Sequence, residues 1–498
     1  MVTTPLTCLN YIDGEWLAAQ SATILESRNP ADWREVIATF PSSGAEDVDA
    51  AVMAASKAYH SWRLTPAPAR AEFIYRVGEI LLQRKEEMAY LMSQEMGKPL
   101  AEARGDVQEG IDCAIYSAGE GRRMFGQTTP SEMPNKFAMT VRSPIGVCAL
   151  ITPWNFPVAI PCWKMMPALV CGNTVILKPA KDTPACATLL VEIFQQAGLP
   201  DGVVNLIHGH GDEVGRALIE HPGINLVSFT GSSQTGAEVG ATCGRTFKRV
   251  CLELGGKNAQ IVMDDADLEL ALEGAIWGAF GTTGQRCTAT SRLILHRDIK
   301  EKFTAMLLDK TRKLCLGKGT ELDTEVGPLV NKSQLERVSY YLEVAHNEGA
   351  KVLIGGNVCC NEQLKHGFFF EPTILDRVTP DMRVAREEIF GPVVSLIEVS
   401  SFEEAIEVLN DTPYGLSSSV YTSNINRAFQ AMRDIEAGIT YINGPTIGAE
   451  VHLPFGGVKQ TGNGHREAGS AAIDVFTEWK TVYVDFSGRL QRAQIDNR

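Results

Sequence analysis

Short apolar runs alternate with segments of helical spacing between residues 145 and 265. Each run of four or five mostly aliphatic residues is followed by a turn and then by apolar positions that recur every three or four residues. This strand–helix alternation predicts a parallel sheet with right-handed crossovers. The predicted strands span residues 147–151, 174–177, 203–207 and 225–229, and the helices that follow them span 159–171, start near Pro184, span 213–220 and start near Ser233.

A second alternating region runs from Asn258 to about Asn443 and predicts a second α/β domain. Residues 45–96, which precede both regions, have the spacing of two or three helices. The elements predicted in the second region are helices at residues 268–280, 299–314 and 331–348 and strands at 292–296, 393–398 and 417–421.

Two further strand-like segments, residues 136–142 and 481–485, lie outside these regions. We expect them to pair and to form an edge that a partner subunit extends. The predicted organisation is therefore one domain from residues 1–124 and 145–254, a second from 255–466, and a small β oligomerisation element from 125–144 and 467–498.

Composition narrows the class of protein. A chain of 498 residues with 44% hydrophobic and 21% charged residues is globular and long enough for two to four domains. The net charge of −14 argues against nucleic acid as a partner, and neither a signal peptide nor a membrane span is predicted. Twelve cysteines without a CxxC pattern indicate reduced thiols in the cytoplasm, and nine histidines without ligand spacing predict no metal site.

Three separate motifs supply the groups that covalent acyl chemistry needs. Cys287 lies in Gly-Gln-Arg-Cys-Thr, Glu253 in Leu-Glu-Leu-Gly-Gly and Asn155 in Pro-Trp-Asn-Phe-Pro. They offer a nucleophile, a base and an oxyanion donor. Arg286 and a helix expected after Cys287 would favour the thiolate. Taken singly, each has a plainer explanation: a buried cysteine, a carboxylate in a structural ion pair, and a turn residue.

A second group of motifs indicates a site for a phosphate-bearing ligand. The segment Phe229–Gly236 follows a strand and opens a helix, where free backbone amides favour anions. Lys178 and Lys181 lie at the end of another predicted strand, at the edge where doubly wound sheets bind ligands. The alternatives are an ordinary βα turn and two solvated lysines. Phe390, in the turn at residues 388–392, is a further candidate for ligand binding, and its alternative role is core packing.

With these motifs in view, the chain resembles the aldehyde dehydrogenase superfamily over nearly its whole length. The order of Asn155, Lys178, Gly231, Glu253, Cys287 and Glu388 is that of the family. The resemblance implies a Rossmann-like NAD(P)-binding domain, a catalytic α/β domain carrying Cys287, and a homodimer or homotetramer.

The resemblance also implies roles for individual residues. Cys287 would attack the aldehyde, with the oxyanion held by Asn155 and the Cys287 N–H; hydride transfer would leave a thioester, and Glu253 would activate water to hydrolyse it. Lys164 matches a family lysine near the active site. The residues expected to bind the cofactor are Thr152, Trp154, Lys178, Lys181, Gly211, Phe229, Gly231, Ser232, Leu254, Glu388 and Phe390.

One position departs from the pattern of NAD-preferring members. Many of them carry a glutamate three residues after the position of Lys178, where it binds both ribose hydroxyls, and this chain has Lys181 there. A lysine cannot accept those hydrogen bonds, yet it attracts a 2′-phosphate. The expected cofactor is therefore NAD or NADP, and Lys181 favours tolerance of NADP, including use of both.

Arg286 carries the substrate prediction. It resembles the arginine of semialdehyde-oxidising branches, where a guanidinium can clamp a distal carboxylate, with Phe156 and Phe455 as the other predicted substrate contacts. The chain's tail is most similar to the 2-oxoglutarate semialdehyde group, whereas Gln108-Glu109 is similar to the α-aminoadipate semialdehyde group. Alternatives are a dehydrogenase for uncharged aldehydes with a structural Arg286, a cysteine esterase, and a non-catalytic binding protein.

Overall fold

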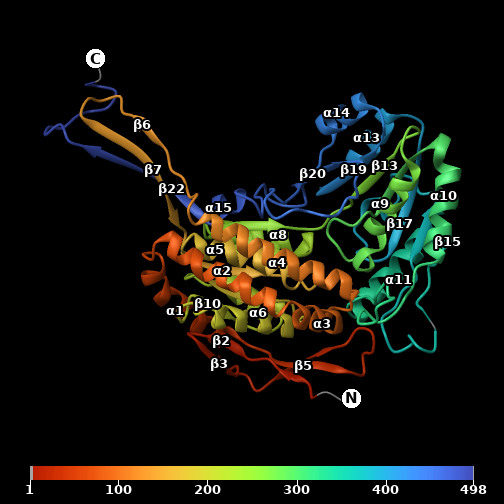
Figure 1. Cartoon of the computed structure of the whole chain (residues 1–498), viewed down its shortest axis with the longest axis horizontal. Helices are drawn as coiled ribbons and strands as arrows, with labels where there is room; N and C mark the ends of the chain where they lie inside the picture. Colours follow the sequence, from red (N-terminus) through yellow and green to blue (C-terminus); the bar gives the residue numbers. More distant parts are fainter. Residues whose placement is uncertain (1–3, 360, 497–498) are drawn as a thin grey trace.

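The computed structural model describes residues 4–359 and 361–496. Two seven-stranded sheets form the body, and a three-stranded arm projects from it (Figure 1). The predicted α/β class, with a parallel sheet in each of two successive regions, is confirmed. The predicted domain boundaries stay a prediction, and their outermost residues, 1 and 498, lie outside the described residues.

The first sheet is built from the alternating region around residues 145–265. Five of its strands are parallel, and two short antiparallel strands from the start of the chain extend one side. In spatial order the strands are β12 (Arg249–Glu253), β11 (Leu226–Thr230), β8 (Val147–Ile151), β9 (Thr174–Lys178), β10 (Val204–Leu206), β2 (Asn10–Ile12) and β3 (Glu15–Leu17).

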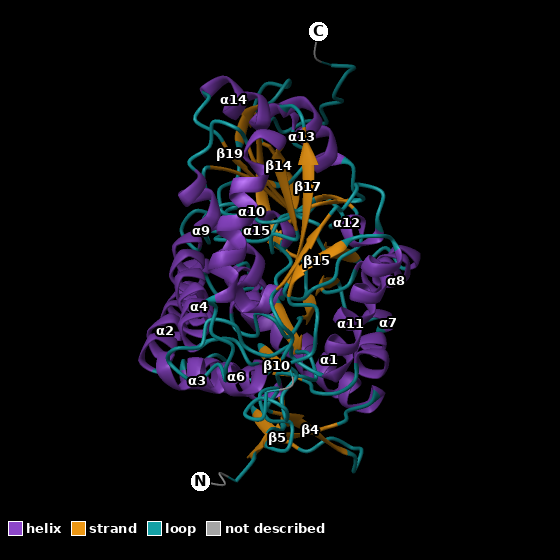
Figure 2. Ribbon diagram, turned by 90° about the vertical axis from the view of Figure 1, so that its right-hand side faces the viewer, coloured by secondary structure: helices purple, strands orange, loops and turns teal. Residues whose placement is uncertain are grey.

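Strand β8 shows why this sheet needs helices on both faces. Val147, Ala149 and Ile151 belong to one buried cluster, whereas Cys148 and Leu150 belong to another on the opposite face. Figure 2 shows the helices on the two sides of the strands. One side has α1 (Ala45–Trp62), α7 (Arg216–Glu220) and α8 (Ser233–Arg245), and the other has α2 (Ala67–Gln83), α3 (Lys85–Met96), α4 (Leu100–Glu120), α5 (Ala159–Val170) and α6 (Pro184–Gln196).

The predicted helix at residues 213–220 differs in detail from the structure. It begins as a wide π-helical turn, η1 (Gly211–Gly215), and only then continues as α7. The other helices predicted in this region begin within a residue of their expected positions, and Ser232 caps α8 by accepting a hydrogen bond from the Thr235 N–H.

The second sheet is parallel except for one antiparallel strand at its edge. In spatial order its strands are β15 (Lys351–Ile354), β16 (Thr373–Asp376), β17 (Val393–Val399), β14 (Arg292–His296), β13 (Ala259–Val262), β19 (Ser417–Tyr421) and β20 (Ile439–Ile442). Its helices are α9 (Leu268–Phe280), α10 (Arg297–Arg312), α11 (Lys332–Asn347), α12 (Arg383–Arg386), α13 (Phe402–Asn410) and α14 (Ile425–Asp434).

The arm joins two segments that are far apart in sequence. Strand β7 (Lys136–Pro144) pairs antiparallel with β22 (Thr477–Asp485) along nine residue pairs, and β6 (Thr128–Pro130) lies on the other side of β7. The predicted pairing of these segments is confirmed. Short helix α15 (Ala471–Val475) leads into β22.

Several elements were not predicted. Among them are strand β13 and the small sheet of β1 (Leu6–Thr7), β5 (Val36–Pro41) and β4 (Ile24–Arg28), together with β16, β20, helices α13 and α14, and the two-stranded sheet of β18 (Tyr414–Gly415) and β21 (Val458–Lys459). No helix among the described residues is long and apolar enough to cross a membrane.

Candidate active site

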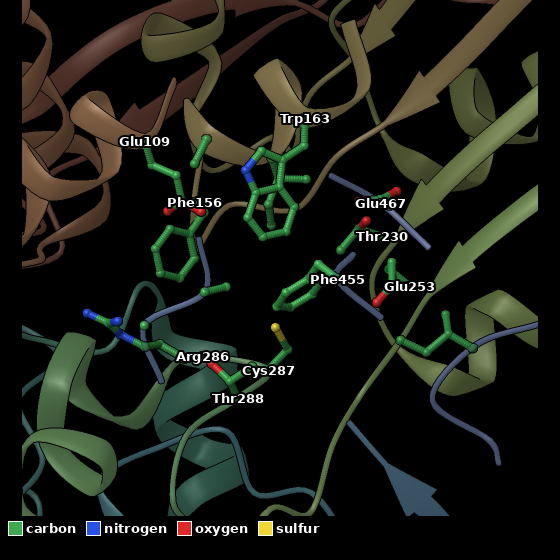
Figure 3. Close-up of a pocket in the computed structure, with 15 residues that line it drawn as sticks. Glu109, Phe156, Trp163, Thr230, Glu253, Arg286, Cys287, Thr288, Phe455 and Glu467 are labelled. Atoms are coloured by element: carbon green, nitrogen blue, oxygen red, sulfur yellow. The ribbon is translucent and has the colours of Figure 1, made fainter. Parts of the chain in front are cut away.

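Cys287 lies in the wall between two cavities. One, of about 660 Å³, has Phe156, Trp163, Phe455, Arg286 and Glu253 in its wall, and we call it the aromatic cavity. The other, of about 690 Å³, lies beyond the carboxyl ends of β8, β11 and β12, and we call it the strand-end cavity. A group bound in either cavity therefore meets the same thiol. Figure 3 shows the sulfur of Cys287 pointing into the aromatic cavity.

The backbone carbonyl of Cys287 is fixed by two neighbours. The Asn258 Nδ2 group donates to it at 2.8 Å, and Gly256 packs so closely that any side chain there would place its Cβ 2.5 Å from the carbonyl oxygen. Burial raises the pKa of the Cys287 thiol, and the nearby carboxylates of Glu253 and Glu388 raise it further. The raised pKa favours the thiol over the thiolate.

This corrects two expectations about the nucleophile. No helix follows Cys287: residues 288–291 run without one directly into β14. The guanidinium of Arg286 is paired with Glu102 and does not lower the pKa of the thiol. The expected helix is therefore absent at residues 288–291, and the charge of Arg286 is paired with Glu102, so neither favours the thiolate.

Asn155 is buried beside this loop and lines the strand-end cavity with Cys287. Its Nδ2 group donates one hydrogen bond to the carbonyl of Gln285 at 2.9 Å. A side-chain amide has two N–H donors, so one donor orients the group and the other is available to an oxyanion.

Glu253 ends strand β12 and is only 3% exposed. Neither carboxylate oxygen has a hydrogen-bond partner among the described residues. Gly456 packs so closely against the carboxylate that any side chain at this position would place its Cβ 2.5 Å from Oε1. Burial raises the pKa of Glu253 well above its usual value; the charge of Glu467 adds to this and the charge of Lys164 opposes it. An unpartnered carboxyl with a raised pKa in a cavity is suited to act as a general base.

Lys164 and Glu467 lie behind Glu253. They form a buried ion pair, and Lys164 Nζ also donates to the Ser228 hydroxyl at 2.7 Å. Because Glu467 lines the aromatic cavity, this pair places a second carboxylate near the water that Glu253 would activate.

The strand-end cavity combines six of the predicted cofactor-binding residues. They are Trp154, Gly231, Ser232, Leu254, Glu388 and Phe390. A Cβ on Gly231 would lie 2.6 Å from the ring of Phe229, so this approach requires glycine. The hydroxyl of Thr230, in the same wall, is buried and has no hydrogen-bond partner among the described residues.

The turn at residues 388–390 is fixed from helix α11. Phe390 has a φ of 64°, which is rare for an aromatic residue. Gln334 Nε2 donates to the Phe390 carbonyl at 2.7 Å, and Arg337 Nη2 donates to the Glu388 carbonyl at 2.5 Å. The Glu388 carboxylate accepts from the Gly256 N–H at 3.0 Å. Gln334 and Arg337 also line the cavity, and the sequence analysis missed both.

Five predicted cofactor residues lie outside the lining of the strand-end cavity. Thr152, Gly211 and Phe229 follow or end strands of the first sheet on the same edge. Lys178 ends β9, is 4% exposed, and donates to its neighbour's carbonyl; burial lowers its pKa to about 8. The Lys181 side chain is 51% exposed and lies 3.4 Å from Asp182.

All three predicted substrate residues, Arg286, Phe156 and Phe455, line the aromatic cavity. Arg286 Nε donates to the Thr282 hydroxyl at 2.9 Å and Nη2 to Glu102 at 2.6 Å. No hydrogen bond involves Nη1 among the described residues, so the end of the guanidinium remains for a ligand. Glu109 and Trp163 line the same cavity. Glu109 belongs to the Gln108-Glu109 pair that is similar to the α-aminoadipate semialdehyde group, whereas Trp163 was not predicted and no local motif marks it.

No group of three or more histidine, cysteine, aspartate or glutamate side chains among the described residues is placed to hold a metal ion.

Comparisons with known proteins agree with this geometry. The model of the aldehyde dehydrogenase family matches residues 16–482. An α-ketoglutaric semialdehyde dehydrogenase of Bacillus subtilis is 45% identical over 97% of the chain and 99% of its own length. An α-ketoglutarate semialdehyde dehydrogenase of Haloferax volcanii is 44% identical over 95% and 98%. The structure of betaine aldehyde dehydrogenase from Staphylococcus aureus in complex with NAD+ is 34% identical, covers 97% of this chain and 96% of that one, and has a TM-score of 0.95.

Proposed function

The chain belongs to the aldehyde dehydrogenase family, and from that premise we propose that it oxidises a carboxylate-bearing semialdehyde to the diacid, with NAD or NADP as hydride acceptor. The observation that carries the substrate class is Arg286, whose guanidinium lies in the wall of the cavity into which Cys287 points. The relatives of Bacillus subtilis and Haloferax volcanii are named for α-ketoglutarate semialdehyde, so this aldehyde, 2-oxoglutarate semialdehyde, is the first substrate to test.

The residues at the junction of the cavities account for the protein's part in the reaction. The Cys287 thiol first loses its proton to solvent water, and Sγ then adds to the aldehyde carbon; the resulting oxyanion accepts from the free Asn155 N–H and the Cys287 backbone N–H. A bound nicotinamide supplies the hydride acceptor. The thioester left on Cys287 is hydrolysed by water that loses its proton to Glu253, which frees the thiol and the carboxylic acid.

The strand-end cavity fits a dinucleotide. Gly231 leaves room for a close approach, the first amides of α8 lie behind it, and the Thr230 hydroxyl has no protein partner among the described residues. Glu388 can accept from ribose hydroxyls, and Phe390, whose ring centroid is 5.5 Å from that of Trp154, offers an apolar wall for a flat ring. We accordingly infer that residues 1–124 and 145–254 bind the cofactor and that residues 255–466 carry the nucleophile.

Arg286→Ala tests the substrate class. We expect kcat/KM for 2-oxoglutarate semialdehyde to fall about 100-fold, because the distal carboxylate loses charge-assisted hydrogen bonds worth ~3 kcal/mol. The rate with pentanal, an uncharged aldehyde of equal length, should change little. Initial rates of reduced-nicotinamide formation measure both. A uniform small loss with both aldehydes would make Arg286 structural and leave the uncharged-aldehyde alternative.

Glu109 bears on which of the two carboxylate-bearing candidate substrates, 2-oxoglutarate semialdehyde or α-aminoadipate semialdehyde, fits the cavity better. It lines the aromatic cavity near Arg286, and burial, followed by the charge of Asp106, raises its pKa to about 8. The raised pKa favours the protonated carboxyl, which can donate a hydrogen bond, and this suits the 2-oxo oxygen of 2-oxoglutarate semialdehyde better than the ammonium of α-aminoadipate semialdehyde. A higher kcat/KM with the aminoadipate compound would reverse the assignment.

Lys181 is proposed to admit NADP. Its side chain is exposed at the carboxyl end of β9 and has one carboxylate partner, Asp182, at 3.4 Å. In Lys181→Glu we expect the ratio of kcat/KM for NADP to that for NAD to fall at least about tenfold, because a carboxylate repels a 2′-phosphate and accepts from ribose hydroxyls. Lys332→Glu, another exposed lysine, provides the charge control. An unchanged ratio would remove Lys181 from cofactor selection.

We infer a cytoplasmic homodimer or homotetramer held by the arm formed from residues 125–144 and 467–498. Strand β22 is an unpaired edge of the arm and β20 an unpaired edge of the second sheet, and Trp479 and Tyr483 on β22 are exposed. Sedimentation velocity measures the assembly, and a monomer at assay concentration would contradict it.

A further inference from the structure

Three successive residues before the nucleophile have left-handed backbone conformations. Thr282 has φ 51° and ψ 31°, Thr283 has φ 58° and ψ 33°, and Gly284 has φ 68°. Glycine adopts this conformation readily, but a β-branched residue with positive φ is a rare exception, and here two are adjacent. Both threonines are buried, so the turn needs neighbours that hold it in place.

Glu102, on helix α4, supplies the charged part of that support. Its Oε1 accepts from the Thr282 N–H at 3.0 Å, and its Oε2 accepts from the Thr282 hydroxyl at 2.5 Å. The same Oε2 accepts from Arg286 Nη2 at 2.6 Å, and Arg286 Nε donates to the Thr282 hydroxyl at 2.9 Å. The Glu102 carboxylate, Thr282 in the turn and Arg286, directly before Cys287, are thus linked to one another in a closed network of hydrogen bonds.

The remaining contacts hold the turn from the other side. The Thr283 hydroxyl donates to the Gly327 carbonyl at 3.0 Å, and Gln285 Nε2 donates to the carbonyls of Thr282 and Pro328, each at 3.3 Å. These partners all belong to the catalytic region, whereas Glu102 reaches the turn from a helix 180 residues earlier in the chain. Glu102 is therefore the contact that ties the nucleophile loop to the helices of the first sheet.

We propose that Glu102 is a positioning residue: its carboxylate holds residues 282–284 in the left-handed turn and, through the same oxygen, fixes the guanidinium of Arg286. It thereby sets both the location of the Cys287 thiol and the anion-binding end of the aromatic cavity. Glu102 does not contact the substrate in this assignment. The inference rests on the proposed function for its activity measurements only.

The two consequences can be separated by substitution. Glu102→Ala should lower kcat about tenfold or more with both 2-oxoglutarate semialdehyde and pentanal, because the thiol moves from its productive position, and should raise KM only for the acidic aldehyde. Adding Thr282→Gly lets the turn form without strain, so we expect kcat to recover with pentanal while KM for the acidic aldehyde stays high. Glu102→Gln keeps an acceptor for Thr282 but places an amide donor near Arg286, so kcat should be largely retained and KM for the acidic aldehyde raised.

A measurement without any aldehyde tests the turn directly. The rate of Cys287 alkylation by iodoacetamide, followed by mass spectrometry of its peptide, should change in Glu102→Ala and return toward wild type with Thr282→Gly. Glu86→Gln is the matched control, because it removes a glutamate–arginine pair between α3 and α4 at the surface, 2.8 Å from Arg104. Its kcat, KM and alkylation rate should equal those of the wild type.

Two results would overturn the proposal. One is unchanged kcat, KM and alkylation in both Glu102 variants. The other is a loss in Glu102→Ala that follows a lower Tm and that Thr282→Gly leaves unrepaired. If the wild type shows no preference for the acidic aldehyde, the proposed substrate class fails, but pentanal turnover and alkylation still decide the role of Glu102.

Discussion

Replacing Cys287 by serine is expected to lower kcat for aldehyde oxidation by about 10⁴-fold or more, the scale seen when a covalent nucleophile is removed. Cys287 is the cysteine that lines both cavities, and its sulfur points into the one that contains Arg286. A serine hydroxyl has a far higher pKa than a thiol, so much less of it is ionised and it attacks an aldehyde far more slowly. Initial rates of reduced-nicotinamide formation measure the loss.

The control for this variant is Cys315→Ser. Cys315 is an exposed thiol remote from both cavities, and its replacement should leave kcat unchanged. Binding of NAD or NADP to Cys287→Ser, followed by fluorescence quenching, should match that of the wild type. Residual turnover within about tenfold of wild type would show that another group forms the covalent bond.

Glu253→Gln is expected to lower steady-state kcat about 10³-fold while leaving a rapid burst of one reduced nicotinamide per active site. Addition to Cys287 and hydride transfer precede the step in which water is activated, so the enzyme stops as the thioester. Rapid-mixing absorbance measures the burst, and the acyl group adds its mass to the Cys287 peptide. A variant with no burst would place Glu253 before hydride transfer.

Glu253 is also expected to set the pH dependence of kcat. Burial and the Glu467 charge raise the pKa of Glu253, and only its deprotonated form can accept a proton from water. Wild-type kcat should therefore increase with pH through this raised pKa and level off above it. The Glu253→Gln variant should lose that rise. A wild-type profile that is flat from mildly acidic to alkaline pH would contradict the role of Glu253 as base.

The sequence indicates several interior strands well because short runs of aliphatic, aromatic or small residues form them. Strands β14 and β19 have the predicted bounds, and every residue of both is buried, although β19 begins with three serines. Helix α4 is harder to recognise, because its buried side includes Asp106 and partly buried Glu102 and Glu109, which interrupt an apolar stripe. The two-residue strand β1 is exposed and offers no periodicity to detect.

The residues of the candidate site also fall into those that a local motif indicates and those that only tertiary contacts bring to the site. Cys287, Asn155 and Phe390 lie in local motifs with a chemical meaning, and the structure brings them to shared cavities. Gln334 and Arg337 act through backbone carbonyls of a distant turn, which no local pattern encodes. The left-handed turn at residues 282–284 also escapes sequence reasoning, because threonine pairs favour extended backbone. The turn is held by tertiary contacts, from Glu102 to Thr282 and from Thr283 to the Gly327 carbonyl.

The unpaired edges of β20 and β22 give each newly made chain a problem of biogenesis. An uncovered strand edge can form backbone hydrogen bonds with any extended chain. The exposed side chains of Trp479 and Tyr483 add apolar surface that such a contact would bury. In the assembly proposed above, pairing between copies would cover these edges in a bimolecular step, whose rate depends on the concentration of finished chains. In that assembly the yield of active enzyme would depend on expression level as well as on stability.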